Sequence, residues 1–119
     1  MYPRNMNHIG LTVTDIEEAV SWYQAVLGFT LVMPPIEAKD DGGHFADIIS
    51  DIFGNNFDSL KLAHLATGDG IGVELFEFSK PKSKRSENNF EFWKTGIFHL
   101  CVTDPEIELL AERIDDTGG

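Results

Sequence analysis

Cysteine is almost absent from the sequence, which has Cys101 as its single thiol in 119 residues. One cysteine cannot form a disulfide within the chain, and this fits a reducing, cytoplasmic location. It also excludes a structural zinc site built on paired cysteines. We interpret Cys101 as a small apolar residue of a strand.

Long apolar runs are absent as well. No stretch approaches the roughly 18 continuous apolar residues of a membrane span, and residues 1–7 are polar with no apolar run behind them. We therefore expect no membrane anchor and no export signal. Hydrophobic residues still make up 42% of the chain, which supplies a globular core. The length suits one compact domain over residues 1–119.

Basic residues are scarce, because nine Lys and Arg stand against twenty Asp and Glu and leave a formal net charge of −11. Such a chain repels nucleic-acid phosphates and anionic lipid surfaces, so we expect neither as a partner. One cluster concentrates the cations, KPKSKR at residues 80–85. It is either a solvated loop or a small clamp for an anionic ligand.

The apolar pattern predicts the order strand, helix, three strands, then a further strand and helix. Asp15 and Glu18 form a capping box that starts the first helix, and Gly28 ends it. Pro34 and Pro35 close the second strand because they cannot continue a ladder of hydrogen bonds. We predict strands over 8–14, 29–33, 59–66, 72–78 and 96–103, helices over 16–27 and 107–114, a hairpin turn over 67–70, and a lid-like insertion over 37–58.

The opening of the chain is repeated near its end. His8 begins HIGLTVTDIEEAVSWYQAVLGF, and His99 begins HLCVTDPEIELLAERIDDTGG. Each histidine opens a strand that leads through Val-Thr and Asp into an acidic helix ending at glycine. This internal similarity indicates a duplicated unit that pairs with its copy around one shared core.

A carboxylate lies inside the apolar strand GVELFEF. Because side chains alternate between faces, Val73 and Leu75 share one face while Glu74 and Phe76 share the other. A carboxylate in such surroundings is costly to bury alone and needs a cation.

His8 and His99 occupy equivalent places in the two repeats, so pairing of the repeats would bring both imidazoles to one point. Two imidazoles and the Glu74 carboxylate suit one divalent zinc, nickel, iron, cobalt or manganese ion. Taken singly, a strand histidine is more often a hydrogen-bonded core residue, and a strand glutamate more often faces water.

Two other histidines, His64 and His44, lie outside this predicted ligand set. If the hairpin turns about Asp69, His64 lies opposite Glu74 and can hydrogen-bond this carboxylate from a second shell. The alternative for His64 is an exposed or core-edge strand residue. His44 lies in an acidic, glycine-flanked loop and is interpreted as solvated.

These segments resemble the vicinal-oxygen-chelate superfamily of glyoxalases, bleomycin resistance proteins and extradiol dioxygenases. The stretch from NHIGLTVTD to VLGF is similar to its first strand and helix, GVELFEF to its fourth strand, and GIFHLCVTD to the start of its second module. The lactoylglutathione lyase-like branch is the most similar. The resemblance implies an α+β fold of paired βαβββ modules in a cup-shaped mixed sheet, with module one at about 6–79, a linker at about 80–95 and the start of module two at about 96–119.

The resemblance also implies site residues and chemistry. His8, Glu74 and His99 match the metal ligands of the family, with Glu74 also catalytic. From the strand pattern we place His64 and Phe76 in the second shell or substrate pocket. The implied function is a metal-dependent glyoxalase-type lyase or isomerase, of the carbon–sulfur lyase class, acting on a small oxygen-chelating substrate through an enediolate-type intermediate. The alternatives are a non-catalytic module that binds an antibiotic or another small molecule, and an iron extradiol-type dioxygenase.

One departure from the family concerns the second module, which in the family runs on for three further strands. The last of these supplies a fourth ligand, whereas this sequence stops at Gly119. We expect the chain to be truncated, to be completed by another chain, or to lack that carboxylate. An incomplete module leaves strand edges exposed, so we expect a homodimer.

Overall fold

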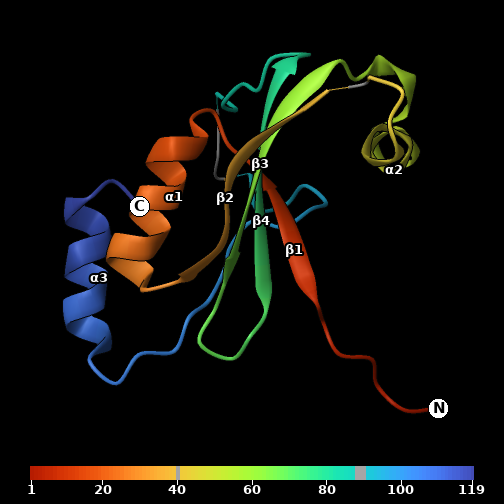
Figure 1. Cartoon of the computed structure of the whole chain (residues 1–119). Helices are drawn as coiled ribbons and strands as arrows, with labels where there is room; N and C mark the ends of the chain where they lie inside the picture. The colour runs from red at the N-terminus through yellow and green to blue at the C-terminus, as the bar shows by residue number, and fades with distance from the viewer. Residues whose placement is uncertain (40, 88–90) are drawn as a thin grey trace. The chain divides into compact units, whose positions relative to one another are not determined.

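The computed structural model describes residues 1–39, 41–87 and 91–119. Residue 40 of the predicted insertion and residues 88–90 of the predicted linker lie outside the described residues. The chain divides into two compact units, Met1–Lys84 and Arg85–Gly119. The elements in chain order (Figure 1) are β1 His8–Thr12, α1 Ile16–Leu27, β2 Thr30–Lys39, α2 His44–Phe53, the 3-10 helix η1 Gly54–Asn56, β3 Ser59–Ala66, β4 Gly72–Lys80 and α3 Ile107–Asp116.

The first unit is built on a four-stranded mixed sheet with the order β1-β4-β3-β2. β1 pairs with β4 in parallel, whereas β4 with β3 and β3 with β2 are antiparallel. The sheet is open, and the predicted α+β class is confirmed. Because β4 lies between β1 and β3, strand β1 at the start of the chain lies beside the hairpin of β3 and β4, which comes much later in the sequence.

Helix α1 begins and ends where the sequence predicts. The Asp15 carboxylate accepts a hydrogen bond from the Glu18 amide at 2.9 Å, which satisfies one free amide of the first turn. Gly28 adopts a left-handed conformation with φ of 67°, which a residue without Cβ adopts at no steric cost. The structure adds one contact that was not predicted, from the Ile16 amide to Glu77 Oε2 at 2.8 Å.

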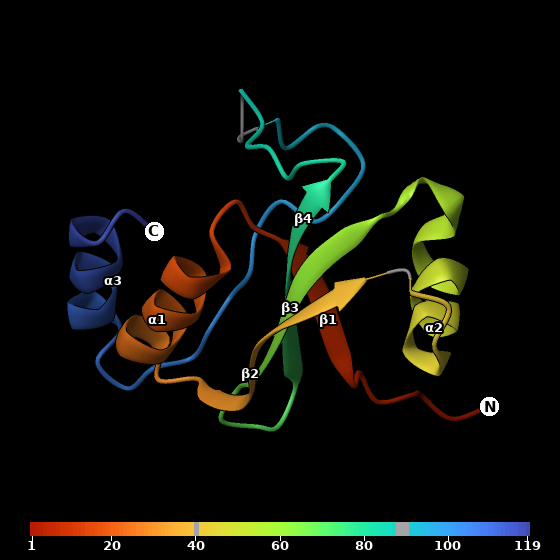
Figure 2. The same cartoon turned by 45° about the horizontal axis from the view of Figure 1, so that its top comes forward.

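The two faces of the sheet are covered by different helices, with α1 on one face and α2 on the other (Figures 1 and 2). The alternation predicted for β4 is confirmed, because Val73 and Leu75 belong to the core under α1 while Phe76 and Phe78 pack on the core under α2. The buried residues under α1 are Ile16, Val20, Ala63, Leu65, Val73 and Leu75, and those under α2 are Ala38, Ile49, Phe57, Leu60 and Leu62.

Strand β2 is longer than predicted and runs through Pro34 and Pro35 to Lys39. It lies at the edge of the sheet, where one side of a strand needs no partner. Its register with β3 shifts between Leu31 and Met33 and again between Met33 and Ile36. Pro34 and Pro35 lie in this irregular stretch, so their missing amide hydrogens remove no regular hydrogen bond between β2 and β3. The insertion that follows forms helix α2.

The strand predicted over 96–103 is not formed, although the helix after it is present as α3. A strand needs a neighbour for its backbone hydrogen bonds, and the described residues of the second unit contain no other strand. The segment is exposed, including Ile97, Phe98 and Cys101. In the described part of the chain, none of the helices has the length and apolar character needed to cross a bilayer.

Candidate functional site

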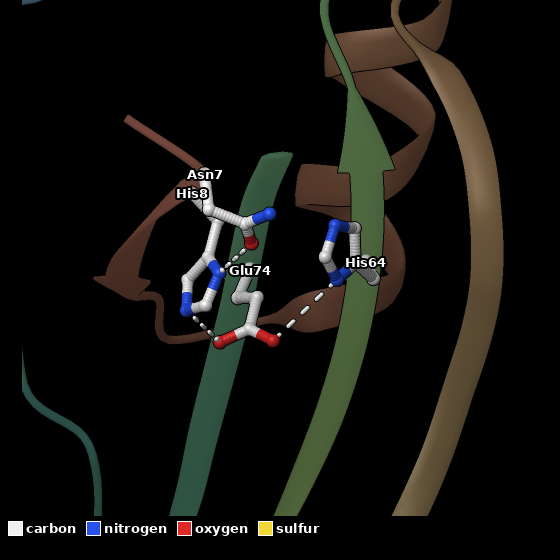
Figure 3. A network of polar contacts seen from close by, with 4 residues as sticks. All are labelled: Asn7, His8, His64 and Glu74. Atoms are coloured by element: carbon white, nitrogen blue, oxygen red, sulfur yellow. Dashed lines mark hydrogen bonds and ion pairs between the residues drawn. The ribbon is translucent and has the colours of Figure 1, made fainter. Parts of the chain in front are cut away.

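Three titratable side chains from three neighbouring strands point toward one another (Figure 3). They lie on the sheet face opposite the core under α1, the face on which α2 packs. β1 supplies His8, β3 supplies His64 and β4 supplies Glu74. Glu74 is paired directly with His64 across the antiparallel ladder, while His8 is paired with Gly72, two residues before Glu74, across the parallel one. Residues two apart on a strand share a face, so the register places all three side chains on one side.

The Glu74 carboxylate lies between the two imidazoles. Its Oε2 is 3.4 Å from His8 Nε2, and its Oε1 is 3.4 Å from His64 Nδ1. The imidazole rings are 6.1 Å apart at an angle of 64°. About a quarter of the Glu74 and His64 side chains is exposed, against 43% for His8, so the cluster is open to a solute from the His8 side.

Asn7 orients the ring of His8. Its Oδ1 lies 2.7 Å from His8 Nδ1, and its backbone oxygen accepts a hydrogen bond from the Gly72 amide at 2.8 Å. An amide oxygen can only accept, so this contact favours the tautomer in which His8 Nδ1 carries the proton. The unprotonated Nε2 then faces Glu74 and is free to bind a cation.

Gly72 lies between the two histidines. A Cβ added to it would be 2.6 Å from His64 Nε2 and 2.7 Å from His8 Cβ, closer than real Cβ atoms approach. A side chain at this position would therefore force the His64 ring and the β1 backbone at His8 to shift.

The same face becomes aromatic immediately beyond Glu74. Phe76 stacks on Phe78 with ring centroids 6.2 Å apart and meets the edge of Phe53 of α2 at 5.7 Å. It also covers Gly10, where an added Cβ would lie 3.1 Å from Phe76 Cε2. A solute at the polar cluster would thus have an apolar surface beside it.

His8 and Glu74 suit a metal ion in both donor type and spacing. Two donors at about 2.0–2.1 Å from one tetrahedral metal are about 3.4 Å apart, which is the observed separation of His8 Nε2 and Glu74 Oε2. His64 approaches the other carboxylate oxygen, so it holds Glu74 from the side rather than joining this pair. Within the described residues, no three His, Cys, Asp or Glu side chains gather as the ligands of one metal ion.

The predicted site residues have different placements. His8, Glu74 and His64 come together, and Phe76 lies on the same face. His99 belongs to the second unit, where it is exposed in the segment predicted as a strand and meets the Phe98 ring at 4.5 Å. Its role as a third ligand stays a prediction. His44 is exposed, as expected, although it starts α2 instead of lying in a loop.

Asn7 and Gly72 were missed by the sequence reasoning. Each adjoins an element that had been identified, Asn7 just before β1 and Gly72 at the start of β4. The available signal was their position, since a polar residue next to a candidate ligand can orient it. A glycine opening a strand also marks a close approach.

The chain is similar to known proteins in sequence and in fold. It is 25% identical over 109 residues to a 2-epi-5-epi-valiolone epimerase from an Actinomyces species, an alignment that covers 92% of this chain and 56% of that protein. The chain thus spans about half the length of this relative. Its fold matches the crystal structure of a glyoxalase family protein from Bacillus cereus with a TM-score of 0.75 and 18% identity, covering 99% of this chain and 74% of that one.

The sequence profile of one superfamily matches residues 5–119, nearly the whole chain. The chain therefore belongs to the Glyoxalase/Bleomycin resistance protein/Dioxygenase superfamily.

Proposed function

We propose that this protein is a metal-dependent lyase or isomerase of the glyoxalase type that acts on a small substrate with two neighbouring oxygens. The observation that carries the proposal is the spacing of His8 Nε2 and Glu74 Oε2, 3.4 Å, on one sheet face. His8 and Glu74 would hold a divalent zinc, nickel, iron, cobalt or manganese ion, with His99 as the further ligand that the family resemblance implies.

Each residue of the first unit has a distinct task in this proposal. His8 presents a lone pair at Nε2 because Asn7 accepts the hydrogen bond at Nδ1. His64 holds Oε1 of Glu74, which leaves Oε2 for the cation. The bound metal would act as a Lewis acid and stabilise negative charge developing on the two substrate oxygens. Glu74 is the carboxylate of this cluster and the first candidate for moving a proton.

An isomerase reaction has additional support from the relative named above, which is an epimerase. Epimerisation next to a carbonyl and glyoxalase-type isomerisation both begin when a proton leaves the carbon beside that carbonyl. Both therefore require stabilisation of an enolate-type intermediate, which is an enediolate where the carbon carries a hydroxyl. The proposed reaction is therefore a proton transfer at carbon, with no single substrate named.

Metal content measured by elemental mass spectrometry tests the site. We expect about one equivalent of a divalent metal in the parent after reconstitution and little in His8→Ala or Glu74→Ala. His44→Ala is the matched control, because His44 is exposed at the start of α2 and should leave metal content unchanged. His99→Ala tests the third ligand separately. Equal metal content in the parent and in both first-unit variants would refute the site.

Deuterium exchange into hydroxyacetone, followed by proton NMR, tests the chemistry. The metal-loaded parent should exchange the carbon-bound hydrogens beside the carbonyl faster than the His8→Ala variant does. A metal-loaded protein without exchange would contradict the lyase or isomerase assignment. Bound iron together with oxygen consumption on a catechol would instead favour the dioxygenase, and a protein that holds no metal would favour a binding module.

A further inference from the structure

A cavity lies at the end of the sheet away from His8. Its volume is about 330 Å³, and it is lined by Thr12, Phe53, Asn56, Phe57, Phe78, Pro81, Lys82 and Ser83. This volume is at the lower end of the roughly 300–1,000 Å³ found for small-molecule pockets. Thr12 and His8 are the two ends of β1, so the cavity is about 13 Å along the strand from the proposed metal ligand.

Aromatic rings form the walls of this cavity. Phe53 meets Phe78 edge to face at 5.0 Å and 85°, and Phe57 meets Phe78 in the same way at 6.5 Å and 86°. Phe57 is 7% exposed and is anchored in the core under α2. Rings held at right angles present both faces and edges to the cavity. Another aromatic ring packs favourably against such a wall, because aromatic pairs prefer edge-to-face and offset-stacked contacts.

A cation lies at the rim of the cavity and is held there by the backbone. Lys82 is exposed, and among the described residues it takes part in no ion pair. Its neighbour Lys80, by contrast, forms an ion pair in which Nζ is 3.6 Å from Asp58 Oδ2. The turn that carries Lys82 is fastened to β4, because the Ser83 amide donates to the Phe78 oxygen at 2.9 Å and the Phe78 amide donates to Ser83 Oγ at 2.7 Å. The rim is thus formed before any ligand arrives.

The concentration of positive charge here runs against the charge of the whole chain. The segment KPKSKR holds four of the nine basic residues in a protein of net charge −11. The net negative charge of the chain repels anions in general, whereas Lys82 and the basic residues next to it in the sequence attract an anionic group locally. Phe53 and Phe57 belong to α2 and the segment after it, whereas Lys82 follows β4, and the fold brings these residues together around one cavity.

We infer that this cavity binds a small aromatic anion, with its ring between Phe53, Phe57 and Phe78 and its carboxylate, sulfonate or phosphate at Lys82. The inference goes beyond the proposed metal site and does not depend on it, because none of the lining residues belongs to the His8–Glu74 cluster. It gives the basic segment the role of an anion clamp rather than that of a solvated loop.

Fluorescence titration with 8-anilinonaphthalene-1-sulfonate tests the inference on the whole metal-free chain. We expect one saturable site in the parent. Lys82→Glu should bind the probe at least roughly tenfold more weakly than the parent, since an attraction at close range becomes a repulsion. Lys82 is exposed, so this variant should keep the fold. Arg4→Glu carries the same charge change next to the Tyr2 ring, outside the cavity lining, and should bind as the parent does.

Two further measurements separate the contribution of the ring to binding from that of the charge. N-phenyl-1-naphthylamine has the same rings without the sulfonate, so Lys82→Glu should not change its affinity. Thr12→Trp would fill the cavity and should abolish saturable binding of both probes, while His8→Ala should retain both. Unchanged sulfonate binding in Lys82→Glu, or unchanged binding of both probes in Thr12→Trp, would overturn the inference.

Discussion

At the scale of single residues, the candidate site requires a glycine at position 72, because there is no room for a Cβ atom there. Gly72→Ala would place that atom 2.6 Å from His64 Nε2 and 2.7 Å from His8 Cβ. The His64 ring can turn away, but His8 Cβ is tied to the backbone, so β1 and β4 must separate. We expect a loss of about 1–3 kcal/mol in the free energy of unfolding and roughly tenfold weaker metal binding.

Denaturant unfolding and titration with a metal-sensitive dye measure the two effects of Gly72→Ala. Gly68→Ala is the matched control, because an added Cβ there meets nothing within 4 Å. If both alanine variants retain the stability and metal affinity of the parent, the close approach at Gly72 is not important for the site.

Asn7 is expected to act as a positioning residue for His8. Asn7→Ala removes the acceptor 2.7 Å from His8 Nδ1, so the proton is no longer favoured on that nitrogen. Nitrogen-15 NMR of the metal-free protein should show a shift of His8 toward the other tautomer, and metal affinity should fall about 10–100-fold. Asn7→Asp retains an acceptor and should restore both. An unchanged tautomer in Asn7→Ala would contradict this role.

At the scale of elements, α1 is joined to the sheet at its first residue. Glu77 Oε2 accepts from the Ile16 amide at 2.8 Å, and a carboxylate is favoured at a helix N-terminus. We expect Glu77→Ala to lower the free energy of unfolding by about 1–2 kcal/mol and Glu77→Gln, which retains an acceptor, to lower it less. Glu37→Ala is the control, because the Glu37–Lys39 pair is largely exposed and contributes about 0.5 kcal/mol or less.

The packing of α1 also gives the protein a pH dependence. Burial raises the pKa of Tyr23 above its usual value of 10.0, and its ring stacks on Phe29 at 5.6 Å. Between the unfolded and the folded pKa the folded state binds more protons, so the free energy of unfolding should fall as the pH rises above about 10. Tyr23→Phe should reduce this fall, measured by denaturant unfolding at pH 9 to 11. Tyr2→Phe, at an exposed position, should not.

At the scale of the whole molecule, the open sheet predicts self-association. β1 and β2 each have a single neighbour in the sheet that the described residues form, and free strand edges invite pairing with another chain. We expect a homodimer by light scattering. Val13 directs its amide to Phe76 of β4, so alternation sends the Thr12 amide to the open edge. Thr12→Pro should then shift the mass toward the monomer, whereas Thr12→Val should not. A monomeric parent would refute the prediction.

Much of the local structure followed from short-range patterns. The alternation in GVELFEF predicted the face of Glu74, the pair Asp15 and Gly28 predicted the bounds of α1, and the turn about Asp69 predicted that His64 lies opposite Glu74. These patterns succeed because caps, turns and strand alternation depend on residues a few positions apart.

The sequence by itself therefore determined β1, α1, β3 and β4 of the first unit, the face on which Glu74 lies and the family to which the chain belongs. Only the tertiary structure decided that β1 runs parallel to β4 with His8 beside Gly72 and that β2 continues through its prolines at an edge. It also decided that residues 96–103 form no strand and that residues 81–83 border an aromatic cavity. Each of these depends on which segment becomes the neighbour of another, and such pairing is set by contacts between residues far apart in the chain.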